Sequence, residues 1–111
     1  MIELQHLTKR FTTQSGTVVA LNDINLTIRD GDIYGIIGMS GAGKSTLVRC
    51  INMLERPDEG TVAVNEHRME ALTPAQLRAA RREITMIFQQ FNLLMQRTCL
   101  RNIMFPMELA K

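Results

Sequence analysis

The sequence lacks any run of apolar residues near the ~20 that a helix needs to cross a membrane. Its first residues also lack the basic stretch and long apolar run that mark a secretory signal. Any association with a membrane is therefore expected to go through a partner. The net charge is +2, which is too small an excess to indicate binding to nucleic acid.

Cysteine is scarce as well. Cys50 and Cys99 lie far apart in the sequence, and no His or Cys stands near them at the spacing of metal ligands. Two reduced thiols, as in the cytosol, fit this pattern better than a disulfide. With 45% apolar and 22% charged residues, the composition is that of an ordinary folded chain. Its 111 residues fit one domain at most, so residues 1–111 are taken as part of a single domain.

Alternation of apolar and polar residues predicts a β-rich layer at the N-terminus. We expect strands over residues 2–11, 18–21 and 24–28, with a turn at 12–17. Residues 33–37 and 84–88 are mostly apolar, which is typical of strands buried on both faces, and a further strand is expected at 61–64.

Helical signals follow the apolar segments. Apolar residues recur with helical period over residues 44–54. Thr73, Pro74 and Gln76 form a capping box with proline in the first turn, which predicts a helix to about residue 83. Thr98 can cap a last helix that Pro106 would bend or break. Strand–loop–helix units behind a β layer predict an α/β fold.

The strongest signal is a glycine-rich loop at residues 38–45. Its sequence GMSGAGKS matches the phosphate-binding pattern G-x-x-x-x-G-K-[ST] at every fixed position, between a predicted strand and a predicted helix. Backbone N–H groups in such a loop bind anions, and the helix behind it adds unpaired donors and a positive dipole end. A glycine-rich turn with a solvated lysine is the alternative, and the intact motif argues against it.

Most residues of the loop, and Thr46 directly after it, are candidates for binding the phosphates of ATP. Lys44 can place its ammonium on the β- and γ-phosphates, the Ser45 hydroxyl can ligate Mg²⁺, and Thr46 can donate to a neighbouring phosphate. Gly41 and Gly43 allow turns that a Cβ would hinder. The candidate nucleotide-binding residues are Gly38, Ser40, Gly41, Ala42, Gly43, Lys44, Ser45 and Thr46.

The loop alone does not settle the reaction, because transporters, kinases, GTPases and motors all use it. Hydrolysis also needs an Asp at the end of a strand to hold Mg²⁺ and a group that positions water. No apolar run after the loop ends in an acidic residue. A GTPase should carry an Asn-Lys-x-Asp motif, which is not present, and no acceptor pocket of a kinase is recognisable.

Two segments carry a resemblance to a known family. Residues 38–60, GMSGAGKSTLVRCINMLERPDEG, and residues 84–94, ITMIFQQFNLL, resemble ABC-transporter ATPase subunits, most closely those of bacterial methionine importers. The resemblance runs along essentially the whole chain. It implies a P-loop α/β core with an N-terminal antiparallel β layer, truncated before the signature and Walker B segments.

The resemblance also implies cofactors, partners and further site residues. The cofactors would be ATP and Mg²⁺, with ATP held between two ATPase subunits of a homodimer at the cytoplasmic face of the membrane. Phe11 takes the place of the family's adenine-stacking aromatic residue. Gln89 matches the glutamine that reaches Mg²⁺ and the attacking water, with Gln90 as the candidate if the register is off by one. Lys44 and Gln89 would be the catalytic residues, and Ser45 and Gln89 the metal ligands.

The loop after Gln89 would contact the permease subunits and couple ATP binding to the uptake of methionine or another amino acid. We place this contact at residues 91–97, from Phe91 to Arg97, where a surface loop is rich in apolar residues. The alternative is that these residues fold back into the core of the chain.

Several family features are not found. The signature Ser-Gly-Gly segment, the Mg²⁺-holding Asp, the catalytic Glu and the switch His all belong after residue 111. His6 and His67 stand in the wrong place to be that His, and His67 is expected on a surface turn. We therefore expect the 111 residues to bind nucleotide weakly without turnover. The alternative is a truncated, non-catalytic module that binds nucleotide or a partner.

Overall fold

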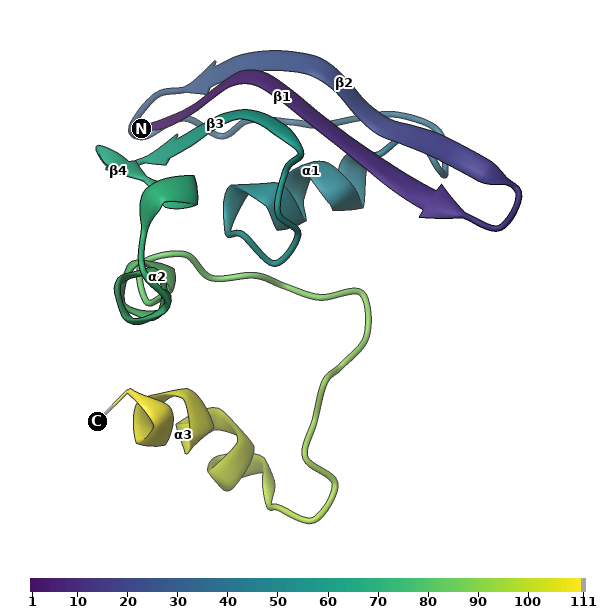
Figure 1. Cartoon of the computed structure of the whole chain (residues 1–111). Coiled ribbons are helices and arrows are strands. Elements are labelled where there is room, and N and C mark those ends of the chain that lie inside the picture. The colour runs from purple at the N-terminus through teal and green to yellow at the C-terminus, as the bar shows by residue number, and fades with distance from the viewer. Residues whose placement is uncertain (111) are drawn as a thin grey trace.

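The computed structural model describes residues 1–110, and its N-terminal part is built around an antiparallel sheet (Figure 1). The sheet has four strands in the order β2-β1-β3-β4. They are β1 (Ile2–Thr13), β2 (Gly16–Ile28), β3 (Glu59–Val64) and β4 (His67–Arg68). The expected β layer is thus present. His67 lies in β4 rather than on a turn, and its side chain is exposed as predicted.

The two strands predicted at 18–21 and 24–28 form one continuous strand, β2. Irregular pairing explains the break in the sequence pattern, because β1 and β2 shift register at three places between Leu4 and Arg10. At one of them Lys9 faces Leu21 while Arg10 faces Val19, so Ala20 is an extra residue on β2. Such bulges interrupt strict alternation without ending the strand.

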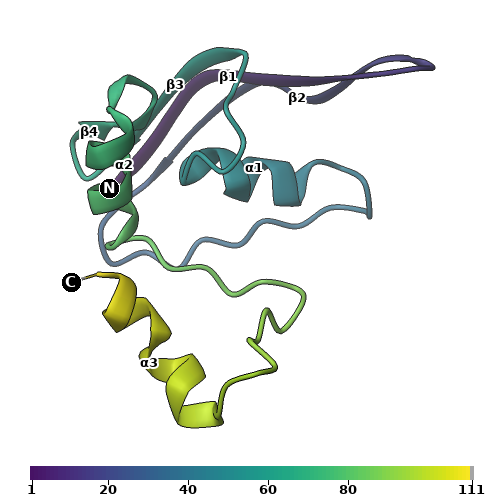
Figure 2. The ribbon, with the colours of Figure 1, turned by 60° about the horizontal axis from the view of Figure 1, so that its bottom comes forward.

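Helix α1 (Lys44–Ile51) lies against one face of the sheet, as Figures 1 and 2 show. Leu47, Cys50 and Ile51 are its buried residues, and they pack with Leu4 and Val62 of the sheet. The remaining members of this core are Leu7, Leu21, Met53, Val64, Met69 and Leu77. The helix was expected to reach residue 54 but ends earlier, since Met53 has a left-handed φ of 63° and Leu54 is exposed.

The later helices begin where the sequence predicted. A short 3-10 helix, η1 (Met69–Ala71), precedes α2 (Pro74–Arg81). The predicted capping box of α2 is present: the Gln76 N–H donates to Thr73 Oγ1 at 3.2 Å and the Thr73 N–H donates to Gln76 Oε1 at 3.0 Å. Helix α3 (Cys99–Leu109) is capped by Thr98, and it continues through Pro106, so of the two expected effects of this proline, the break does not occur.

The strands predicted at residues 33–37 and 84–88 do not form. Neither segment is assigned to a strand, and Ile33, Ile37 and Ile87 are fully exposed rather than buried. A strand requires a neighbour that completes its hydrogen-bond ladder. Within residues 1–110 the sheet pairs only β1 to β4, and these two segments have no place in it. Several of their apolar side chains are therefore exposed on the surface.

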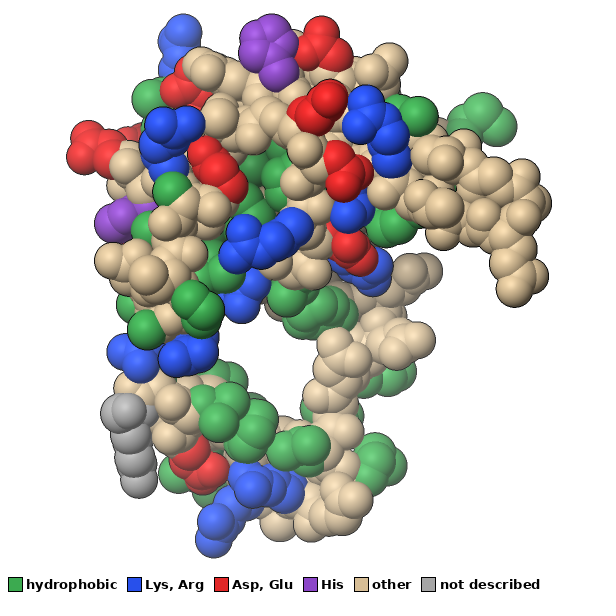
Figure 3. All heavy atoms as spheres, in the orientation of Figure 1, with side chains coloured by type: hydrophobic (Ala, Val, Ile, Leu, Met, Phe, Trp, Pro, Cys, Tyr) green, Lys and Arg blue, Asp and Glu red, His purple; other side chains and the backbone are tan. Residues whose placement is uncertain are grey.

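Residues 29–43 return along the side of α1 that faces away from the sheet (Figure 2). The segment after α2 passes on the same side and then leads to α3, which stands apart from the sheet. An open hollow lies between α3 and the sheet part of the molecule in Figure 3, while the C-terminal end of α3 shares a pocket with residues of α2. No described residue of α3 is buried. None of the helices among residues 1–110 is long and apolar enough to span a bilayer.

Candidate functional site

The glycine-rich loop leads from the exposed segment at 33–37 into the first turn of α1. Gly43 is the N-cap of α1 and has φ of +100°, and Gly41 has φ of +83°. A Cβ on Gly43 would lie 2.6 Å from the carbonyl oxygen of Ala20 in β2. Left-handed backbone and close approach together require glycine at position 43. The sequence motif thus sets the path of the chain into the helix.

Lys44 turns its side chain back over the loop. Its ammonium donates hydrogen bonds to the carbonyl oxygens of Gly38 at 2.6 Å and Met39 at 2.8 Å. The Ala42 N–H also donates to the Met39 carbonyl, at 3.0 Å, which closes a turn within the loop. Lys44 carries the only positive side-chain charge of the motif, and these two hydrogen bonds hold its ammonium over the loop. Oxygen atoms of a bound anion could take the place of the two carbonyls as acceptors.

A hollow of about 420 Å³ opens beside the start of α1. Lys44 and Ser45 line it from the helix, and Gln89 lines it from the segment after α2. The adjacent residues Lys44 and Ser45 therefore share one cavity with Gln89, which lies more than forty positions later in the sequence. Gln90, the candidate for a shifted register, is not among its lining residues. The remaining lining residues are Ile36, Val48, Arg49, Met86, Ile87 and Phe88.

Arg49 is a lining residue that the sequence analysis did not single out. It lies four residues after Ser45, which places both side chains on the same face of α1. That spacing is the signal that could have found it. Arg49 adds a second positive charge to the cavity that contains Lys44.

The donor atoms of the cavity suit a magnesium ion that arrives with phosphate. Ser45 offers a hydroxyl oxygen and Gln89 an amide oxygen, and Mg²⁺ prefers oxygen ligands while keeping several waters or phosphate oxygens. Among residues 1–110 there is no group of three or more His, Cys, Asp or Glu side chains that could hold a metal. The residues present fit a metal bound jointly by protein and nucleotide, and not a metal held by protein carboxylates.

Phe11 is placed on β1, two residues from the end of the strand, and pairs with Val18 of β2. Its side chain is half-buried, and it is not part of the lining of the cavity beside α1. The Lys9 ammonium lies 5.1 Å from the centroid of its ring. The chain therefore presents a ring near the sheet hairpin and a cationic loop at α1 as two separate features.

The apolar loop at residues 91–97 does not fold back into the core. Phe91, Leu93 and Met95 are exposed. A second hollow of about 410 Å³ lies between this loop and α3, lined mainly by apolar side chains. Exposed apolar groups in one loop are typical of a contact surface for another molecule.

Asn102 of α3 fixes this loop, a role that the sequence analysis missed. Its Oδ1 accepts the Leu94 N–H at 2.8 Å. Its Nδ2 donates to the carbonyls of Leu94 and Arg97, both at 3.2 Å, and of Thr98 at 2.9 Å. A polar residue on the first turns of a helix, just after an apolar loop, is the only sequence signal for it.

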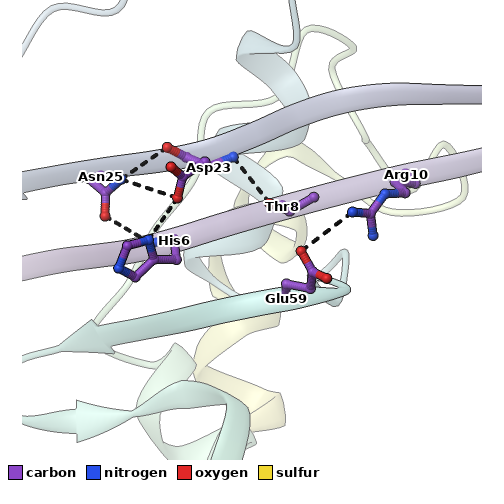
Figure 4. A network of polar contacts seen from close by, with 6 residues as sticks. All are labelled: His6, Thr8, Arg10, Asp23, Asn25 and Glu59. Atoms are coloured by element: carbon purple, nitrogen blue, oxygen red, sulfur yellow. Dashed lines mark hydrogen bonds and ion pairs between the residues drawn. The ribbon is translucent and has the colours of Figure 1, made fainter.

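A separate polar cluster lies on the exposed face of β1 and β2 (Figure 4). His6 Nδ1 and Asp23 Oδ1 are 2.7 Å apart, and the His6 N–H donates to Asn25 Oδ1 at 2.9 Å. The hydrogen bond from His6 holds the pKa of Asp23 below its ordinary value. His6 and Asp23 both have φ of 52°, so these contacts stabilise irregular backbone in the paired strands. None of the three residues lines the cavity beside α1.

Three comparisons relate this chain to known proteins. The ABC transporter family model matches residues 21–111. The methionine import ATP-binding proteins of Shouchella clausii and Lactiplantibacillus plantarum are 54% and 56% identical over 110 residues. Each alignment covers 99% of this chain and 32% of the relative, so the chain spans about a third of the length of these curated relatives.

Solved structures show the same likeness. The dimeric structure of a bacterial ABC transporter cassette matches all of this chain with a TM-score of 0.93 and 36% identity. The post-hydrolysis state of an ATP-binding cassette bound to ADP and Pi matches with a TM-score of 0.89 and 33% identity. This chain covers 48% of each of those chains. The expected fold, the N-terminal part of a P-loop α/β cassette, is confirmed.

Proposed function

This chain belongs to the ABC transporter family, and on that premise we propose that it binds ATP with Mg²⁺ for an amino-acid importer. In the whole importer, an ATP-binding subunit of this kind would couple ATP binding and hydrolysis to uptake of methionine. The observation that carries the proposal is the meeting of Lys44, Ser45 and Gln89 around one cavity at the start of α1.

The phosphates would bind where the loop carbonyls now accept hydrogen bonds from the Lys44 ammonium. Phosphate oxygens are stronger acceptors for an ammonium than neutral carbonyls, so they would replace the carbonyls of Gly38 and Met39. Backbone N–H groups from Gly41 to Thr46, at the positive end of α1, would supply the other donors. The same residues therefore bind the polyphosphate tail and orient its terminal phosphate.

The metal site would use Ser45 and Gln89. Bound Mg²⁺ would neutralise charge on the phosphates during hydrolysis. The Gln89 amide, which faces the same cavity as Lys44, would orient water at the terminal phosphate. No acidic side chain lines this cavity within the described residues, so we expect the 111-residue chain to bind nucleotide without sustained hydrolysis.

The base would stack on Phe11. Aromatic side chains stack on any base, and in nucleic-acid binders this contact contributes about 1–3 kcal/mol per base. Phe11 therefore adds affinity for a nucleoside over bare triphosphate without choosing ATP over GTP.

The partners would meet the chain at two surfaces. A second ATPase subunit would cover nucleotide at the loop, in keeping with the dimeric form of the related cassette. Permease subunits would contact residues 91–97, whose apolar side chains are exposed beside α3. The complex would then lie at the cytoplasmic face of the membrane, and methionine is proposed because of the names of the curated relatives.

A segment exchange tests the proposal. The aligned segment of the Shouchella clausii methionine import ATP-binding protein is replaced with this chain, giving a segment-swapped subunit. With its permease, this subunit should retain both methionine uptake and ATP hydrolysis. The 111-residue chain alone should show no sustained release of phosphate. Loss of both activities in a folded segment-swapped subunit would contradict the proposal.

A further inference from the structure

Lys9 is held between an aromatic ring and a carboxylate. Its ammonium lies 5.1 Å from the centroid of the Phe11 ring and 4.0 Å from Glu55 Oε2. Only 15% of its side chain is exposed, which is unusual for lysine. Lys9 and Phe11 are two residues apart on β1, so both side chains leave the strand on the same face. The pairing is therefore built into the strand.

The carboxylate partner ties this pair to the helix behind the glycine-rich loop. Glu55 lies four residues after the end of α1, and its N–H donates to the Arg49 carbonyl at 3.3 Å. Arg49 is in the last turn of the helix that begins at Lys44. Lys9 thus connects the strand that contains Phe11 with the C-terminal end of α1.

A second connection runs through the bulge of β2. Ala20 is the extra residue between the partners of Lys9 and Arg10. Its carbonyl oxygen is the atom that a Cβ on Gly43 would approach to 2.6 Å. The bulge opposite Lys9 and Arg10 is therefore also the point at which the end of the glycine-rich loop meets the sheet.

We infer that Lys9 is a positioning residue for the base-stacking ring: its ammonium occupies one face of Phe11 and leaves the other face for the base of the nucleotide. This inference rests on the proposed function. Both faces of an aromatic ring carry negative potential, and a cation on one face is attracted to it. That attraction restrains the ring, and it also reduces the repulsion that a stacked base meets on the opposite face.

The test separates the base from the phosphates. Binding of the fluorescent analogue 1,N6-etheno-ATP to the 111-residue chain is followed by anisotropy, and tripolyphosphate affinity is measured by competition. Lys9→Met keeps the aliphatic stem without the charge and should weaken etheno-ATP binding about two- to fivefold, the range of one cation–π contact. Tripolyphosphate affinity should stay unchanged. Lys9→Arg, which keeps a cation over the ring, should restore the nucleotide affinity.

Matched variants separate positioning from a merely structural role. Arg10→Met removes a neighbouring cation whose Nη2 lies 3.4 Å from Glu59 Oε2 (Figure 4), and it should leave both affinities unchanged. Glu55→Gln removes the ion pair and keeps the ammonium at the ring, so it should change nucleotide affinity less than Lys9→Met does. In a chain that carries Phe11→Ala, Lys9→Met should have no further effect.

The inference is overturned if Lys9→Met leaves nucleotide affinity unchanged. It is equally overturned if Lys9→Met weakens the binding of etheno-ATP and of tripolyphosphate to the same extent. The same holds if Lys9→Met weakens etheno-ATP binding just as much in a chain that carries Phe11→Ala. Failure of the proposed function looks different: the unsubstituted chain would bind neither ligand, or Phe11→Ala would leave etheno-ATP affinity as it was.

Discussion

A Cβ on Gly43 would lie 2.6 Å from the carbonyl oxygen of Ala20, so the end of the glycine-rich loop rests directly on the bulge of β2. The atom that would be approached belongs to the backbone of a paired strand and cannot rotate away. Gly43 also has φ of +100°, where any side chain is strained. The loop and the sheet therefore depend on each other through this one glycine.

Replacing that glycine should destabilise the fold. Gly43→Ala is expected to lower the free energy of unfolding by about 2 kcal/mol or more, from left-handed strain and the backbone clash together. Urea unfolding followed by circular dichroism measures the effect. Gly35→Ala is the matched control, because its Cβ would meet no atom within 4 Å and its φ is not left-handed. Equal stability of the two variants would refute this account of the loop.

Loss of Asn102 should loosen residues 91–98 and leave the sheet intact. Asn102→Ala removes all the hydrogen bonds that join this side chain to Leu94, Arg97 and Thr98. Hydrogen exchange measured by mass spectrometry should become faster in this loop, with little change in β1 to β3. Arg101→Ala, one residue earlier on α3, is the control and should not alter the exchange. If exchange in the loop is the same in both variants, Asn102 does not fix its conformation.

The two cysteines should differ in reactivity and in their effect on stability with pH. Cys50 is fully buried beneath the sheet, and this burial raises the pKa of its thiol, whereas Cys99 is exposed. A maleimide should therefore label Cys99 rapidly and Cys50 only after unfolding. Rapid labelling of Cys50 in the folded chain would show that the core is not packed as described.

The raised pKa also gives the sign of a pH effect. Above about pH 8.5 the Cys50 thiol of the unfolded chain loses its proton while the folded chain keeps it. The folded state then binds more protons, so stability should fall as pH rises through this range. Thermal unfolding of a Cys99→Ser variant between pH 7.5 and 9.5 measures the trend, and a midpoint that rises over this range would contradict it.

Local signals in the sequence were sufficient for much of the fold. The capping box at Thr73 and Gln76 needs only residues three apart, and the structure forms both of its hydrogen bonds. The glycine-rich motif likewise predicted where α1 starts, because Gly43 supplies the left-handed N-cap. Such features are fixed by neighbours in the chain and can be read without knowing the tertiary structure.

Features that depend on distant partners could not be derived in the same way. The apolar segments 33–37 and 84–88 have the composition of buried strands, yet neither has a ladder partner within residues 1–110. The Lys9–Phe11 contact and the bulge at Ala20 require the pairing register, which alternation alone does not give. The resemblance to a family, by contrast, correctly identified an ABC cassette because it compares whole segments.

The most direct measurement is the affinity of the segment-swapped subunit for ATP with Mg²⁺, with and without Lys44→Ala. A charge-assisted hydrogen bond contributes about 1.5–3 kcal/mol, so removing the ammonium should weaken binding roughly 10- to 100-fold and abolish methionine uptake. Arg56→Ala, an exposed cation beyond α1, should leave both unchanged. Unaltered affinity and uptake in a folded Lys44→Ala variant would show that this loop does not bind the phosphates.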